Sequence, residues 1–369
     1  MKEAEKLEIP ASPEAITPEW LTDALRSSSA IENASVTSFD AEIVGAGSGF
    51  LGILAKLDLQ YDAVEPNAPR SVIAKFPTLD PGGREIGNLF RFYEREVRFY
   101  EQVADRVAMR IPRAYYADVD PRTGDFVLLL EDMAPACVGD QVNGCTPEQA
   151  KRAVHDLAQF QAEWWQHPDL AKLDWMPFIN DPVNQSAEAS YQQAWPAFVD
   201  FLGDRLPADT HRVGDRLGSN LITILNEMFD RPQTIVHGDY RLDNLFFATK
   251  HGGCEFGVID WQIANRGIGT FDVAYFLTGN IDVKLRSSCE MDFLKLYHDT
   301  LLAGGVKDYS WDDCLRDYRT SALFCLAYVV ISIGTLDPAN DRGLALMHAW
   351  FDRVSNAIRD LRADELMPA

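Results

Sequence analysis

The sequence is poor in positive charge, and its cysteines form no pattern typical of a metal site or a disulfide framework. Among 369 residues, 34 are lysine or arginine and 56 are aspartate or glutamate, which gives a formal net charge of −22. Such a chain repels phosphate backbones and anionic lipid, which argues against nucleic acid or a membrane as a partner. Attraction of a cationic substrate and simple solubility are both compatible with this charge. The six cysteines are scattered without a C-x-x-C pair, as expected of reduced thiols in a cytoplasm.

Long apolar segments are also missing. The first ten residues, MKEAEKLEIP, lack the apolar centre of a signal peptide. The longest apolar run, residues 322–333, is too short to span a bilayer and predicts a buried helix. With 47% hydrophobic and 24% charged residues the composition is that of an ordinary globular protein, and we expect a cytoplasmic one. The sequence does not indicate an oligomeric state.

The kind of secondary structure changes along the chain. Thr17 and Pro18 predict the start of a short helix that ends near Ser27. Alternating and apolar runs then predict strands over residues 36–44, 53–61, 71–76, 113–119 and 126–130, and a long helix over roughly 85–107. A capping box at Thr146 opens a mostly helical remainder, which is interrupted by short strands between residues 234 and 272.

This change predicts an α+β fold of two lobes with a cleft between them. We expect an N-terminal helical extension over residues 1–30 and a small β-rich lobe over residues 31–132. A larger helical lobe, which would hold the catalytic loop, the metal site and the acceptor pocket, follows over residues 133–369.

The strongest functional signal is the segment IVHGDYRLDNLFF, residues 235–247. It places His237, Asp239 and Asn244 between two apolar runs, a spacing that suits a loop presenting a carboxylate to an incoming hydroxyl and an amide oxygen to a metal ion. A predicted hairpin follows and ends at Asp260, which we therefore expect beside Asn244. Two oxygen ligands completed by phosphate and water suit magnesium. Each residue alone is compatible with an ordinary turn, but the combination favours a catalytic loop.

A glycine cluster and a lysine precede this segment. Gly47, Ser48, Gly49 and Gly52 match G-x-G-x-x-G, but an alternating strand follows instead of a helix. The cluster is therefore interpreted as a hairpin tip whose backbone N–H groups cover phosphates, with a plain flexible turn as the alternative. Lys75 ends the third predicted strand, where an inward-facing lysine would neutralise phosphate oxygens and an outward-facing one would only be solvated.

Glu96 decides between these two interpretations of Lys75. On a helical wheel of the segment after the strand, Glu96 falls in the middle of the apolar half. An unpaired carboxylate there would cost several kcal/mol, so Glu96 needs a cationic partner, and Lys75 is the obvious one. A pair of this kind positions the lysine on phosphates in kinases. Glu94, by contrast, falls on the charged half of the same helix.

From about Ile43 to Leu277 the chain resembles the aminoglycoside phosphotransferase and choline kinase superfamily, and within it the ecdysteroid-kinase-like branch. The segments that carry the resemblance are GAGSGFLG, SVIAKF, YEREVRFYEQV, LLLEDM, HGDYRLDN and VIDWQ. The resemblance implies a bilobal protein-kinase-like fold that uses ATP and magnesium.

Roles for individual residues follow from this resemblance. It implies that Asp239 is the catalytic base and that Asn244 and Asp260 are the magnesium ligands. Lys75 and Glu96 would be the phosphate-positioning pair. The remaining implied roles are backbone contacts to adenine for Glu131 and Met133, a γ-phosphate contact for Arg241, and a brace of the catalytic loop for Asp272.

The sequence therefore predicts an ATP- and magnesium-dependent phosphotransferase that acts on a hydroxyl of a small molecule. A protein substrate is disfavoured because glycine follows His237, tryptophan follows Asp260, and no activation segment ending in A-P-E is present. Two alternatives stay open, namely a protein kinase and a catalytically inactive nucleotide-binding regulator. The identity of the acceptor cannot be inferred from the sequence.

Overall fold

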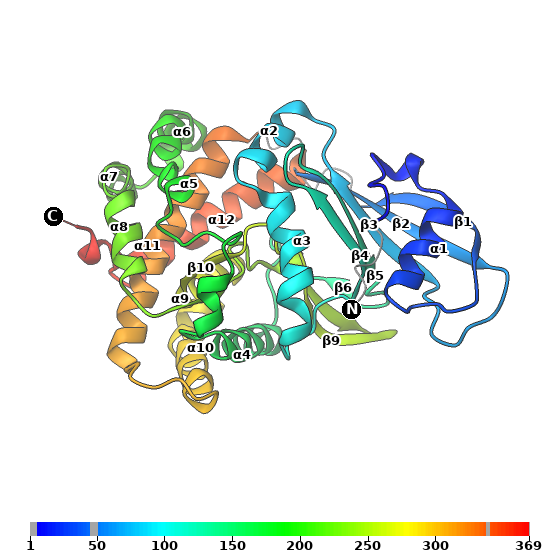
Figure 1. Ribbon diagram of the computed structural model, residues 1–369. Helices are drawn as coiled ribbons and strands as arrows, with labels where there is room; N and C mark the ends of the chain where they lie inside the picture. The colour runs from blue at the N-terminus through cyan, green and yellow to red at the C-terminus, as the bar shows by residue number, and fades with distance from the viewer. Residues whose placement is uncertain (1–5, 45–50, 337–339, 369) are drawn as a thin grey trace. The chain divides into compact units, whose positions relative to one another are not determined.

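The computed structural model describes residues 6–44, 51–336 and 340–368. The chain forms two compact units (Figure 1). The first unit consists of Met1–Pro135 together with the short segments His251–Gly253 and Val258–Ile263. The second unit consists of Ala136–Lys250, Cys254–Gly257 and Ala264–Ala369.

The first unit is built on a five-stranded antiparallel sheet in the order β1-β2-β3-β5-β4. Its strands are β1 (Val36–Val44), β2 (Gly52–Tyr61), β3 (Ser71–Pro77), β4 (Ala114–Asp120) and β5 (Asp125–Glu131). The ends of all five strands differ from the predicted ends by at most one or two residues. The alternation of apolar and polar side chains was sufficient to predict them because each strand packs its two faces differently.

One face of this sheet is covered by α1 (Pro18–Ser27). Thr17 caps the helix as predicted, because its side chain accepts a hydrogen bond from the Trp20 N–H. Leu21 and Leu25 of the helix pack against alternate residues of the strands, which are fully or almost fully buried. These strand residues include Ala55, Leu57, Val72, Ala74, Phe76, Val127 and Leu129. The side chains between them, Lys75 among them, therefore point to the opposite face of the sheet.

The predicted long helix over residues 85–107 is wrong in one respect, because the chain forms two helices there. They are α2 (Pro81–Leu89) and α3 (Phe92–Gln102), and Arg91 between them has a left-handed φ of 54°. The helix-period pattern continues through the break, so side-chain spacing alone does not reveal it. α3 packs on the face of the sheet opposite α1, where Tyr93 stacks on Phe126 at 4.8 Å between ring centroids.

The predicted separation of α3 into an apolar and a charged half is also only partly correct. Glu94 and Arg95, which the wheel places on the charged half, are 9% and 2% exposed. Glu94 is paired with Arg91 at 2.8 Å. Ion pairing along the helix thus allows charged side chains to be covered on a face that a hydropathy pattern assigns to solvent.

The second unit is mainly helical. The capping box at Thr146 is present as predicted and starts α4 (Pro147–Glu163). The other helices are α5 (Pro182–Gln185), α6 (Ala187–Leu202), α7 (Ala208–Leu217), α8 (Leu221–Phe229), α9 (Thr270–Asn280), α10 (Val283–Ala303), α11 (Trp311–Thr335) and α12 (Asp341–Asp360). The short strands are β6 (Cys137–Val138), β7 (Gln233–Val236), β8 (Leu245–Thr249), β9 (Gly252–Val258) and β10 (Asn265–Ile268). β7 pairs with β10, and β6, β8 and β9 form a second small sheet.

The apolar run over residues 322–333 lies in α11, as predicted for a buried helix. α11 is long and apolar enough to cross a membrane by length and composition, but 61% of its apolar window is buried inside the protein. It packs against α6, α9 and α12. This burial is the behaviour of a core helix.

Candidate active site

The first unit contains a cluster of three buried or partly buried charges. Lys75 Nζ on β3 lies 2.6 Å from Glu96 Oε2 on α3 and 3.0 Å from Asp260 Oδ1. The Glu96 side chain is 1% exposed and that of Lys75 is 10% exposed. The pairing of Lys75 with Glu96 that the sequence predicts is therefore present.

The protonation of this cluster follows from burial and from the two neighbouring carboxylates. Burial lowers the pKa of the Lys75 ammonium, but Asp260 and Glu96 outweigh it and hold the pKa above its ordinary value. Burial raises the pKa of Glu96, with Asp260 adding to the shift and Lys75 opposing it. Lys75 therefore stays protonated.

Local backbone features bring these groups together. Asp260 has a left-handed φ of 68°, which aspartate tolerates better than most residues. The next residue, Trp261, is fully buried and stacks on Phe99 of α3 at 4.0 Å between ring centroids, and its backbone N–H donates to Glu96. Gly52 at the start of β2 lies in a tight place, because a Cβ there would be 3.0 Å from the Phe76 carbonyl oxygen.

The predicted adenine-binding segment follows β5. The Glu131 carboxylate is occupied by Arg110 and by the Arg113 N–H. Asp132 accepts hydrogen bonds from the Ala134 N–H at 2.9 Å and from the Ser71 hydroxyl at 2.8 Å. In the described part of the chain the Met133 N–H has no hydrogen-bond acceptor. Hydrogen bonds of the Glu131 and Asp132 side chains thus fix this segment, while the backbone N–H of Met133 remains a donor without an acceptor among the described residues.

The second unit contains the predicted catalytic loop, which follows β7. Gly238 has φ of 86°, a conformation that glycine adopts without strain and that turns the chain directly before Asp239. Asn244 Nδ2 donates to Asp239 Oδ2 at 3.1 Å and to the Asp239 carbonyl oxygen at 2.9 Å. The Tyr275 hydroxyl donates to Asp239 Oδ1 at 2.8 Å. Both carboxylate oxygens of Asp239 are therefore held by hydrogen bonds.

Asp272 on α9 supports the backbone of this loop, as the resemblance implies. Its carboxylate accepts hydrogen bonds from the N–H groups of His237 at 2.7 Å and Gly238 at 3.0 Å. Gln161 Nε2 donates to the same carboxylate at 3.1 Å. Asp272 is fully buried, and burial raises its pKa to about 7 despite these three hydrogen bonds.

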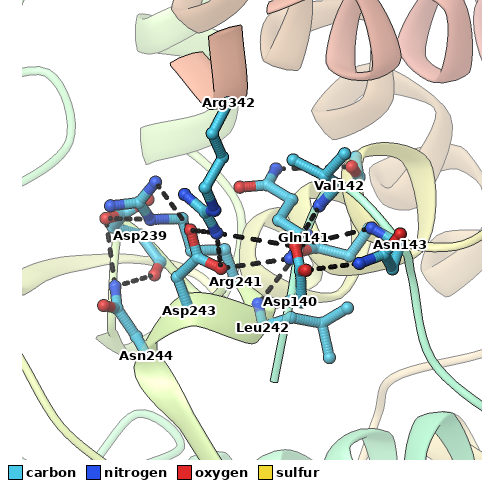
Figure 2. A network of polar contacts seen from close by, with 12 residues as sticks. Asp140, Gln141, Val142, Asn143, Asp239, Arg241, Leu242, Asp243, Asn244 and Arg342 are labelled. Carbon is cyan, nitrogen blue, oxygen red and sulfur yellow. Dashed lines mark hydrogen bonds and ion pairs between the residues drawn. The ribbon is translucent and has the colours of Figure 1, made fainter. Parts of the chain in front are cut away.

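Arginine side chains surround the acidic residues of the loop (Figure 2). Arg241 Nε lies 3.0 Å from Asp239 Oδ2, and its Nη1 lies 3.8 Å from Asp243. Arg342, at the start of α12, points at the same Asp243 and donates to it at 3.0 Å and 3.2 Å. Asp243 also accepts from the Gln141 N–H at 3.1 Å. The loop is thus tied to α12 and to the segment after β6.

The side-chain amide of Asn244 has a hydrogen-bonded nitrogen and an oxygen that could serve as a metal ligand. The side chain is 4% exposed, and its nitrogen is used by Asp239. In the described residues no group donates to Asn244 Oδ1. An amide oxygen that accepts no hydrogen bond is an oxygen ligand of the kind that Mg²⁺ accepts.

The predicted site residues fall into the two units. Lys75, Glu96 and Asp260 are together in the first, and Asp239, Arg241 and Asn244 are together in the second. Gly47, Ser48 and Gly49 lie outside the described residues. The predicted proximity of Asp260 to Asn244 and the roles of all these residues stay predictions.

Sequence reasoning missed Tyr275, Asn280 and Arg342. Asn280 Oδ1 accepts from the Leu242 N–H at 2.8 Å and so fixes the loop just after Arg241. Tyr275 is one helical turn after Asp272, which is a signal that would have found it, because residues three apart share a helix face. Arg342 lies about a hundred residues after its partner and carries no such signal.

Comparisons with known proteins agree with these features. The model of the ecdysteroid kinase-like family matches residues 46–307. A Ralstonia eutropha protein assigned to the aminoglycoside phosphotransferases has 16% identity and a TM-score of 0.52, covering 94% of this chain and 99% of that one. A choline kinase from Cryptosporidium parvum has 11% identity and a TM-score of 0.54, covering 88% and 91%. No curated protein sequence matches this chain significantly.

The antiparallel sheet, the helical second unit and these similar structures define the fold of a kinase-like phosphotransferase, so the predicted fold class is confirmed. The family model covers well over half of the chain, which therefore belongs to the ecdysteroid kinase-like family. The family is described as ecdysteroid kinase-like, which confirms the predicted class of enzyme, a small-molecule kinase.

Proposed function

We propose that this chain transfers the γ-phosphate of ATP to a hydroxyl group of a small molecule. The observation that carries the proposal is the Asp239 carboxylate, which Tyr275 and Asn244 hold by hydrogen bonds at 2.8 Å and 3.1 Å. A carboxylate fixed in this way, in a loop whose backbone is braced by Asp272, suits a base that orients an alcohol and accepts its proton. Arg241, now paired with Asp239, is the proposed contact for the γ-phosphate.

The first unit would bind the nucleotide. Lys75 is protonated and held by Glu96, so its ammonium group is positioned to neutralise phosphate oxygens. The Met133 N–H and the Glu131 backbone are the proposed adenine contacts, and the glycine segment ending at Gly52 would cover the phosphates.

Magnesium is the proposed cofactor, with Asn244 Oδ1 and the Asp260 carboxylate as its protein ligands. The donor set fits, because one neutral oxygen and one carboxylate leave positions for phosphate oxygens and water. When bound, the ion neutralises phosphate charge and aligns the γ-phosphate. The protein residues act around it, with Lys75 binding phosphate and Asp239 taking the proton of the acceptor.

The test is ATP consumption by the purified chain with magnesium and a panel of acceptors. The panel contains hydroxylated lipids, steroids, aminoglycosides and amino alcohols such as choline, and a mixture of serine- and threonine-containing peptides is the control. We expect ADP formation that depends on one class of small alcohol, together with its phosphomonoester by mass spectrometry. ATP binding without turnover on any acceptor would favour an inactive regulator, and turnover on peptides alone would favour a protein kinase.

A further inference from the structure

The hydroxyl of Tyr275 contacts the side of Asp239 that its other partners leave open. Asn244 and Arg241 both approach Oδ2, at 3.1 Å and 3.0 Å. Tyr275 donates to Oδ1 at 2.8 Å and, among the described residues, is the group that supplies a hydrogen bond to that oxygen. A carboxylate oxygen has two lone pairs, so the hydrogen bond from Tyr275 uses one of the two acceptor directions at Oδ1.

The ring of Tyr275 is held firmly by aromatic neighbours. Trp350 of α12 and Tyr328 of α11 meet it edge to face at 5.7 Å and 5.5 Å between centroids, and Phe271 of the same helix lies at 5.9 Å. Tyr275 is 3% exposed. Its hydroxyl therefore has little freedom to move, and the hydrogen bond that it donates has a defined direction.

The hydroxyl also keeps its proton, so it remains a donor. Burial raises the pKa of Tyr275 well above the usual range, and the charge of Asp239 adds to this shift. The same helix carries Asp272, which accepts from the backbone of the loop. α9 thus holds the loop backbone through one residue and the functional carboxylate through a residue one turn later.

We infer that Tyr275 is a positioning residue, whose hydroxyl fixes the rotation of the Asp239 carboxylate so that the second lone pair of Oδ1 faces the acceptor hydroxyl. The inference rests on the proposed function, because it assigns Tyr275 a task in the same reaction. Without the hydroxyl, the carboxylate keeps its contacts at Oδ2 but can turn about its Cβ–Cγ bond. Fewer bound acceptors would then be aligned for proton transfer, while their binding would be little changed.

The experiment compares Tyr275→Phe with Tyr191→Phe. Tyr191 is a matched control, since it is buried on a helix of the same unit and donates its hydroxyl at 2.9 Å to the Gly214 carbonyl, outside the proposed site. Turnover is followed as hydrolysis of γ-labelled ATP, with water as the acceptor, and as transfer to the alcohol that the panel identifies. We expect Tyr275→Phe to lower kcat by about tenfold or more with KM values within about twofold, and Tyr191→Phe to leave both within about twofold.

A second measurement separates positioning from general destabilisation. Tyr275→Phe is combined with Asp239→Ala, in an assay sensitive enough to follow a further tenfold loss. Because the hydroxyl acts through the carboxylate, we expect the double variant to be within about twofold of Asp239→Ala alone, and the losses in melting temperature not to add. Equal loss of kcat in Tyr275→Phe and Tyr191→Phe, or the same loss from Tyr275→Phe in both backgrounds, overturns the inference and leaves the proposed function standing. Absence of any turnover by the wild type overturns both.

Discussion

Lys75 and Glu96 form an ion pair of 2.6 Å between a strand and a helix of the first unit, and the carboxylate is almost completely buried. A carboxylate in such a place is stable only with its partner, and breaking a buried pair by removing one charge costs about 3–5 kcal/mol. In the sequence, this ion pair is indicated by Glu96 alone, because a glutamate in the middle of an apolar helix face needs a cationic partner.

Replacing Glu96 by glutamine should therefore lower turnover by about tenfold or more with the fold preserved, because Lys75 loses the charge that holds it. The measurement is kcat with circular dichroism of the same samples. The matched control is Glu101→Gln, since Glu101 is on the same helix, is 32% exposed, and pairs with Arg98 at 2.7 Å. It should stay within about 0.5 kcal/mol in stability and unchanged in rate. Glu94 would serve poorly because it is buried. Identical behaviour of Glu96→Gln and Glu101→Gln contradicts the assigned role.

Asp239→Asn should remove phosphoryl transfer and leave ATP affinity nearly intact. The amide keeps the size of the side chain but no longer accepts the proton of the acceptor, and such a loss amounts to about 100-fold or more. Turnover and ATP binding by calorimetry are measured on the same preparation. A variant that retains more than about a tenth of the wild-type rate would show that Asp239 is not the base.

Asn244→Ala and Asp260→Ala should each weaken ATP binding in the presence of magnesium and change it much less in its absence. The reason is that each variant removes one of the two oxygen ligands proposed for the ion. Calorimetry with ATP alone and with MgATP separates the two cases. If both variants show the same gain from magnesium as the wild type, the metal ligands are elsewhere.

The pKa of Asp272, raised by burial from 3.8 to about 7, predicts a pH effect on stability. Between these two pH values the folded protein keeps a proton that the unfolded chain has lost, so this residue makes the free energy of unfolding fall as pH rises from about 4 to 7. The slope is at most about 1.4 kcal/mol per pH unit. Asp272→Asn should be less stable but should lack this slope, which thermal unfolding at several pH values measures. Parallel curves for the two proteins would contradict the raised pKa.

Much of the first unit could be predicted because its signals are local. Strand alternation, the cap at Thr17 and the glutamate at position 96 depend on neighbours within a few residues. The interruption at Arg91 could not, because a left-handed arginine leaves no mark on the hydropathy pattern. The burial of Glu94 depends likewise on ion pairs that a helical wheel does not consider.

The candidate site was predictable where chemistry restricts the choice of residue. Asp239 and Asn244 are recognised by type and spacing, and the hydrogen bonds between them explain that spacing. The supporting residues were not predictable in the same way. Tyr275 looks like one more aromatic residue of an apolar helix, and its one signal is its place a helical turn after Asp272. Arg342 reaches Asp243 only through the tertiary fold, so support of this second kind becomes visible only when the chain is folded.

The tethers from α12 bear on how this chain can be trimmed for expression. The family match stops at residue 307, yet Arg342 holds Asp243, and the buried Arg353 donates to the carbonyl oxygens of Val142 at 3.0 Å and Gly279 at 3.3 Å. At the other end, α1 covers the core face of the sheet from outside the match. A fragment cut at the family boundaries would contain the recognisable motifs but would leave apolar surface uncovered, and it would lack the contact of Arg342 with the predicted catalytic loop. The ends of the family match show which part of the chain resembles its relatives, but in this protein they do not mark where the polypeptide can be cut.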